Sequence, residues 1–425
     1  MFPGPVRSRH PLLRVLPPLA LLLCVPLAGC APGAGSASTS ASASGSASVP
    51  AGSAAERAVR RAVAAWSAAP PERLGAIPLE DWSYEVSSVR EDGVRAFARA
   101  ELRYRLTGYD AAPAGSAREL ELARQDGSGG PGGPGGSWTV VADRPAPGAP
   151  PQLWDQGPVT VERGVHALVL GGAGQSSDSL SVIAAEADKA VPAASAAWPR
   201  PWAGRVVVLV PGSLDAMAAL LGRPADEYRG LGAVTTGRTG AGPAPADRVV
   251  INPEGYGQLS AEGRQVILTH ETTHVATRAA TTAKTPLWLS EGFADWAAYR
   301  GSGRSAAEVA PASGPGGGRG GQRAGGPPEG ALGQGGAVRR GDLPAGLPDD
   351  AAFAFGGDAE ALARAYEGSW LACRLIASRW GEAALVSLYE TAGRESLPSA
   401  TAETLGTDPA GLTRAWQEEL RREFR

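Results

Sequence analysis

The chain has 425 residues, which is enough for two or three domains. Hydrophobic residues make up 43% of it and charged residues 20%, proportions that allow a buried core and are ordinary for a globular protein. The formal net charge of −3 gives no support for binding an acidic polymer, so we expect no nucleic-acid partner.

The N-terminus has the features of a secretion signal. Three arginines precede a short apolar run, residues 15–27, that three prolines interrupt. This run is too short and too broken to span a bilayer as a stable helix. Residues 1–29 are therefore predicted to be a signal peptide that is removed.

The apolar run ends in Leu-Ala-Gly-Cys at 27–30, which resembles the lipobox of bacterial lipoproteins. In those proteins the cysteine is acylated and becomes the first residue of the mature chain. The resemblance implies a lipid on Cys30 that anchors a bacterial protein to the outer face of the cytoplasmic membrane. An ordinary signal peptide with a chance cysteine nearby is the alternative. Residues 30–53 are mostly Ser, Ala and Gly, so we expect a flexible tether there.

Residues 54–145 are predicted to form an accessory α+β domain. A helical pattern over 57–66 is followed by period-2 alternation, which indicates a meandering antiparallel sheet. The predicted strands cover 82–89, 94–106, 119–124 and 138–142, with a loop rich in Gly and Pro at 127–136. One helix followed by several strands resembles the small cystatin-like or nuclear-transport-factor-like modules, but no chemical motif accompanies the pattern.

A second domain is predicted over residues 159–425, after a proline-rich interdomain linker at 145–158. Its first part mixes strands at 159–161, 165–170, 205–210 and 248–252 with helices at 178–191 and 214–221, before a helix that Ser260 begins. This mixture predicts an α+β domain with a mixed sheet, whose last strand is followed by the helix that Ser260 begins. The strand at 248–252 is a candidate edge strand for pairing with an extended peptide.

The C-terminal part is predicted to be a helical subdomain. Residues 301–345 are largely Gly, Pro, Ala and Arg with little periodicity, which indicates a disordered insertion, either neutral or a lid. Helical patterns follow at 358–380, 382–391 and 409–424.

The sequence His-Glu-Thr-Thr-His at 270–274 lies within the helix that Ser260 begins. Residues four apart lie on one face of a helix, so His270 and His274 can reach a single ion while Glu271 points toward its solvent side. The chain has only four histidines, so a chance occurrence of this spacing is rare. A polar helix face with two solvated histidines is the alternative.

The segment Pro-Leu-Trp-Leu-Ser-Glu-Gly-Phe-Ala-Asp-Trp at 286–296 is predicted to form a second helix. It resembles the W-L-x-E-G-x-A-x-[WY] segment of the gluzincins, the clan of thermolysin-like and aminopeptidase-like zinc peptidases. In that clan the Glu of this segment is the third zinc ligand. The resemblance implies one Zn²⁺ bound by His270, His274 and Glu291, with Glu271 as the catalytic base acting on a peptide or protein substrate.

The same resemblance implies roles for two further residues. Asp295 would accept the outer N–H of His270 and fix its tautomer, with a solvated helix acid as the alternative. Tyr366 would donate to the oxyanion, with a buried structural tyrosine as the alternative. His166 lies in a strand pattern and Cys373 in an apolar helical pattern, which favour structural roles for both.

The chain departs from the gluzincin pattern in two ways. The 16 residues between His274 and Glu291 (275–290) are slightly fewer than in the aminopeptidase branch, and no G-x-M-E-N segment is present, so exopeptidase specificity is unsupported. We expect a zinc-dependent peptidase outside the cytoplasmic membrane. The alternatives are a peptidase-like surface binding lipoprotein with little turnover and a purely structural metal, which an open three-ligand site beside a Glu argues against.

Overall fold

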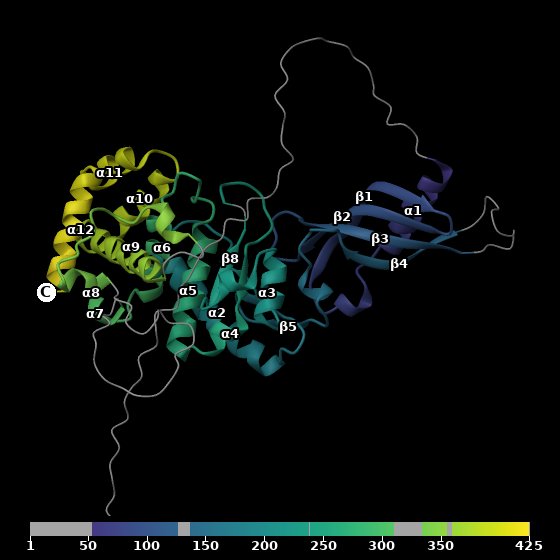
Figure 1. Cartoon of the computed structure of the whole chain (residues 1–425), viewed down its shortest axis with the longest axis horizontal. Coiled ribbons are helices and arrows are strands. Elements are labelled where there is room, and N and C mark those ends of the chain that lie inside the picture. The colour runs from purple at the N-terminus through teal and green to yellow at the C-terminus, as the bar shows by residue number, and fades with distance from the viewer. Residues whose placement is uncertain (1–52, 126–136, 238, 310–333, 355–358, 425) are drawn as a thin grey trace, which may run out of the picture.

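The computed structural model describes residues 53–125, 137–237, 239–309, 334–354 and 359–424. The predicted signal peptide, Cys30, nearly all of the predicted tether and all of the predicted loop at 127–136 lie outside these residues. The fold is α+β, as predicted. Figure 1 shows an antiparallel sheet at one end, a mixed sheet in the middle and the C-terminal helices at the other end.

The N-terminal domain consists of one helix on a four-stranded antiparallel sheet. Its elements are α1 (Ala54–Trp66), β1 (Leu79–Asp92), β2 (Arg95–Leu106), β3 (Ala114–Gln125) and β4 (Ser137–Pro145), in sheet order β1-β2-β3-β4. Side chains alternate along β2, so that every second residue from Ala96 to Leu106 is buried. The predicted helix and meandering sheet are therefore confirmed in kind, and the strands are longer than predicted.

The predicted linker at 145–158 is held at the domain boundary by two buried residues, Leu153 and Trp154. It contains the 3₁₀ turn η2 (Leu153–Asp155), in which Trp154 is 7% exposed and packs edge-on against Tyr104. The Arg118 guanidinium is 1% exposed and donates to the carboxylates of Asp143 and Asp155. A buried charge with this many partners fixes the segment against the N-terminal sheet.

The second domain is built on a five-stranded mixed sheet. Its strands are β5 (Thr160–Arg163), β6 (Ala167–Gly171), β7 (Val206–Val210), β8 (Ala233–Thr236) and β9 (Arg248–Ile251), in sheet order β5-β6-β7-β9-β8. The central strands β6, β7 and β9 run parallel, whereas β5 and β8 are antiparallel to their neighbours. The prediction of an edge strand at 248–252 is wrong, because β8 covers that side of β9. The edge strand on this side is β8, which the sequence patterns missed.

The two faces of this sheet are covered by different partners. Along β6 and β7 successive side chains belong alternately to two hydrophobic clusters. Val169 and Val208 face the cluster that contains helices α2 (Ser177–Ala197) and α5 (Ala261–Thr277). Val207 faces a second cluster, shared with side chains of the N-terminal sheet and the linker. The N-terminal domain thus covers one face of the mixed sheet.

A buried ion pair reinforces this contact between the domains. The Asp110 carboxylate, in the turn after β2, accepts hydrogen bonds from the Arg248 guanidinium at 2.9 and 3.0 Å. It also accepts from the backbone N–H groups of Leu106 and Ala246 at 2.7 and 2.8 Å. Breaking a pair as buried as this one costs about 3–5 kcal/mol in general, so the contact is strong.

The helices that precede α5 lie close to where the sequence patterns predict them, except that α2 extends beyond its predicted end. Before helix α5 lie α3 (Leu214–Leu221), the 3₁₀ turn η3 (Ala225–Tyr228) and α4 (Pro253–Gly257). Helix α2 was predicted to end at 191 but continues to Ala197 through Pro192. The proline removes one backbone hydrogen bond, and burial of Ala194 and Ala197 offsets that loss.

The remaining helices form the C-terminal part of the domain. They are α6 (Leu287–Tyr299), α7 (Ala306–Val309), α8 (Gln334–Arg339), α9 (Ala359–Arg379), α10 (Glu382–Ala392), α11 (Leu397–Leu405) and α12 (Pro409–Glu423), with the 3₁₀ turn η4 (Asp350–Phe353). The disordered insertion predicted over 301–345 is too wide at both ends, because α7 and α8 lie there with Val309 and Ala337 buried. Within the described parts of the chain, no helix has the length and apolar character needed to cross a membrane.

Candidate metal centre

Helix α5 carries the His-Glu-Thr-Thr-His segment into the middle of the domain. The Ser260 hydroxyl accepts from the N–H of Gly263 and caps the first turn. The last two turns are enclosed, so that His270 is fully buried and His274 is 7% exposed. The alternative of two solvated histidines is therefore wrong.

Three side chains from α5 and α6 converge on one point. The Nε2 atoms of His270 and His274 lie 2.9 Å apart, and Glu291 Oε2 lies 3.3 and 3.4 Å from them. Tetrahedral zinc with bonds of about 2.0–2.1 Å separates its ligand atoms by about 3.3 Å. Glu291 Oε2 is buried and accepts no hydrogen bond from any described residue, as expected of an oxygen that faces a cation. Two of the three separations match this value and the third is shorter, so the three residues could hold a metal ion such as zinc.

Asp295 supports the first of these ligands. It lies one turn beyond Glu291 on α6, is 4% exposed, and its Oδ1 is 2.8 Å from His270 Nδ1. The alternative of a solvated acid is wrong, and the predicted contact is present. Burial by itself lowers the pKa of His270, but the carboxylates of Asp295 and Glu291 outweigh it and raise that pKa.

Close packing of α6 on α9 fixes the position of Glu291. A β-carbon at Gly292 would collide with the carbonyl oxygen of Ser369 and lie 3.0 Å from Cys373 Sγ. The glycine thus lets the two helices approach closely beside the ligand. Cys373 is fully buried in this contact, as expected of a core residue.

Glu271 lies beside the three ligands with its two carboxylate oxygens in different surroundings. Its Oε2 accepts a hydrogen bond of 2.6 Å from Thr235 Oγ1 on β8, whereas Oε1 has no partner among the described residues. Burial raises the pKa of the Glu271 carboxyl, an effect that His270 and His274 oppose only in part. A buried carboxyl with one free oxygen is suited to accept and deliver a proton.

Thr235 is a site residue that sequence reasoning missed. The only local signal is the short run Ala-Val-Thr-Thr at 233–236, which Gly232 precedes and Gly237 follows. Four residues are too few to establish a strand by alternation.

Two other predicted residues, Tyr366 and His166, are not among the three candidate ligands. Tyr366 is buried on α9, with its ring packed edge-on against Phe353 at 5.3 Å, and its oxyanion role stays a prediction. His166 precedes β6, and its backbone N–H donates to Asp188 at 2.8 Å. It does not belong to the metal-capable group found among the described residues, which is consistent with a structural role.

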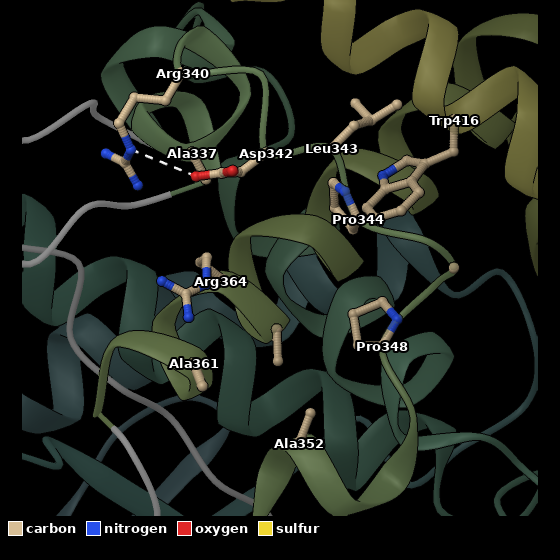
Figure 2. A pocket seen from close by; sticks show the side chains of 12 residues that line it. Ala337, Arg340, Asp342, Leu343, Pro344, Pro348, Ala352, Ala361, Arg364 and Trp416 are labelled. Carbon is tan, nitrogen blue, oxygen red and sulfur yellow. Dashed lines mark ion pairs between the residues drawn. The ribbon is translucent and has the colours of Figure 1, made fainter.

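A cavity of about 560 Å³ lies elsewhere, among α8, α9 and α12. Figure 2 shows Arg340 paired with Asp342 on one side, Arg364 on α9 and Trp416 on α12. None of its lining residues is a ligand candidate, so this cavity is not part of the centre.

Comparison with known proteins adds no relative. No protein-family model matches the chain, and no curated protein matches it. The resemblance to gluzincins therefore rests on the segments at 270–274 and 288–296.

Proposed function

We propose that the protein is a zinc-dependent peptidase that hydrolyses peptide bonds, with one Zn²⁺ held by His270, His274 and Glu291. The observation that carries the proposal is the convergence of two imidazole nitrogens and one carboxylate oxygen beside a buried Glu271. Three protein ligands leave a coordination position open, which is typical of catalytic rather than structural zinc.

The chemistry that zinc supplies in such a site is Lewis acidity, which acidifies water and polarises a carbonyl group. Glu271 accepts the proton of the attacking water through its free oxygen and then delivers it to the leaving amine. Asp295 holds the His270 ring in one tautomer, so that its Nε2 lone pair stays directed at the ligand position. Both acids act from buried positions, where water does not compete for their hydrogen bonds.

The substrate class is supported by the edge strand. Among the described strands, β8 pairs with β9 alone, so an extended peptide could pair with its other edge once the segments that bury its four residues move aside. Binding through backbone hydrogen bonds gives affinity with little sequence preference. Its residue Thr235 contacts Glu271, so a peptide paired with β8 would lie beside the base.

The test of this function is a peptide-library digest with the purified protein. We expect cleavage that a chelator abolishes and added zinc restores, with cut positions read by mass spectrometry. Zinc-loaded protein that cuts none of the peptides would contradict the proposal and favour the peptidase-like binding lipoprotein.

We also propose that the enzyme is displayed on the outer side of the cytoplasmic membrane through a lipid on Cys30. Cys30→Ser is expected to move the protein from the membrane fraction to the soluble fraction, because the thiol that carries the acyl chain is lost. Cys24→Ser is the matched control, since Cys24 lies in the predicted signal peptide and its loss leaves the fractionation unchanged. A Cys30→Ser protein that stays with the membrane would refute the lipid anchor.

A further inference from the structure

The edge strand β8 lies beside helix α5, and the hydroxyl group of Thr235 donates a hydrogen bond from the strand to the helix. Thr235 is 6% exposed, and its Oγ1 lies 2.6 Å from Glu271 Oε2 and 3.2 Å from the Glu271 carbonyl oxygen. A hydroxyl has one hydrogen to donate, and the shorter distance is that of a bond to a charged oxygen. The hydrogen bond therefore goes to the carboxylate.

The position of this hydroxyl is set by the sheet. Thr235 pairs with Val249 in the ladder between β8 and β9, and a β-branched side chain has restricted rotation about its first bond. The neighbouring Thr236 directs its hydroxyl instead to the carbonyl oxygen of Arg248, at 3.4 Å. The strand thus aims one of its two adjacent threonines at Glu271.

A glutamate side chain has several rotatable bonds, so a general base on it needs an anchor to stay in one orientation. Because Oε2 is held by Thr235, the other oxygen, Oε1, is the one that contacts the attacking water. Oε1 has no partner among the described residues. Misplacing a catalytic group by about 1 Å can cost about 100-fold in rate. An anchor at 2.6 Å therefore has a measurable effect on turnover.

We propose that Thr235 is a positioning residue that holds the Glu271 carboxylate in the orientation in which it acts as general base. This inference rests on the proposed peptidase function and extends it to the edge strand. It assigns the two oxygens of Glu271 different tasks, with Oε2 anchored to β8 and Oε1 taking the proton.

The experiment compares Thr235→Val, which keeps the shape and removes the hydroxyl, with Thr235→Ser, which keeps the hydroxyl, and with Thr236→Val as the matched control. In the zinc-loaded enzyme Thr235→Val is expected to lower kcat about 10- to 100-fold with KM and zinc content unchanged. Thr235→Ser is expected to restore most of kcat, and Thr236→Val to retain it. A merely structural threonine would not give this selective loss of kcat.

A second readout needs neither metal nor activity. In chelated protein, Thr235→Val is expected to lower the unfolding midpoint more when Glu271 is present than in a Glu271→Ala background. The reason is that the hydrogen bond needs both side chains, so the Glu271→Ala protein has already lost it. Equal midpoint shifts in the two backgrounds, or an active wild type with an equally active Thr235→Val, would overturn the role of Thr235 alone. A zinc-loaded wild type that cleaves nothing overturns the proposed function and this role with it.

Discussion

Glu271→Gln is expected to keep zinc and lose peptidase activity by about 100-fold or more. The amide has nearly the shape of the carboxyl and can still accept from Thr235, but it cannot take a proton from water. The three ligand atoms come from other residues, so the metal stays. Burial raises the pKa of the Glu271 carboxyl, which means that a neutral replacement removes a costly buried charge and does not unfold the protein.

The measurement is kcat on a peptide found in the library digest, alongside the zinc content of the same preparation. Glu262→Gln is the matched control, because it makes the same change in the first turn of the same helix, where the carboxylate is exposed and pairs with Arg304. Glu262→Gln should behave as wild type. Undiminished hydrolysis by the Glu271→Gln enzyme would remove the proposed mechanism.

His274→Ala is expected to release the metal. Two remaining ligands do not hold zinc in a site built for three, so elemental analysis after dialysis should fall from about one zinc per chain to near zero. Activity should be lost together with the metal.

Asp295→Asn gives a graded comparison, since loss of the partner that orients a ligand histidine typically lowers metal affinity about 10- to 100-fold.

His166→Ala serves as the control for histidine content, because that residue contacts its surroundings through its backbone and is outside the ligand group. It should retain one zinc per chain. A His274→Ala protein that still binds zinc with full stoichiometry would show that the metal lies elsewhere in the chain.

The local parts of the centre could be predicted from the sequence because they depend on helical periodicity alone. The spacing of four places His270 and His274 on one face, and Asp295 one turn beyond Glu291. Periodicity does not predict that helices α5 and α6 pack against each other, because this is a long-range tertiary contact. Only the resemblance to gluzincins predicted it. In the structure, His270 Nδ1 lies 2.8 Å from Asp295 Oδ1, and the Nε2 atoms of His270 and His274 lie 2.9 Å apart.

The features that escaped prediction all depend on tertiary contacts. Strand β8 has only four residues and is defined by its pairing with β9. The sequence alone therefore does not predict the contact between Thr235 and Glu271. Helix α2 continues through Pro192 because its last turn is buried. The linker at 145–158 has the composition of an exposed loop, yet Trp154 is buried in it, because neighbouring strands rather than its own sequence decide its environment.

The burial of Leu153, Trp154 and Val207 under the N-terminal sheet has a consequence for how the protein can be produced. Expressed without its first domain, the second would present Leu168, Leu170 and Val207 to solvent as a contiguous apolar patch, a surface that promotes aggregation. We therefore expect the second domain to aggregate when it is produced alone, and the two domains of the intact chain to unfold together on heating as a single cooperative unit.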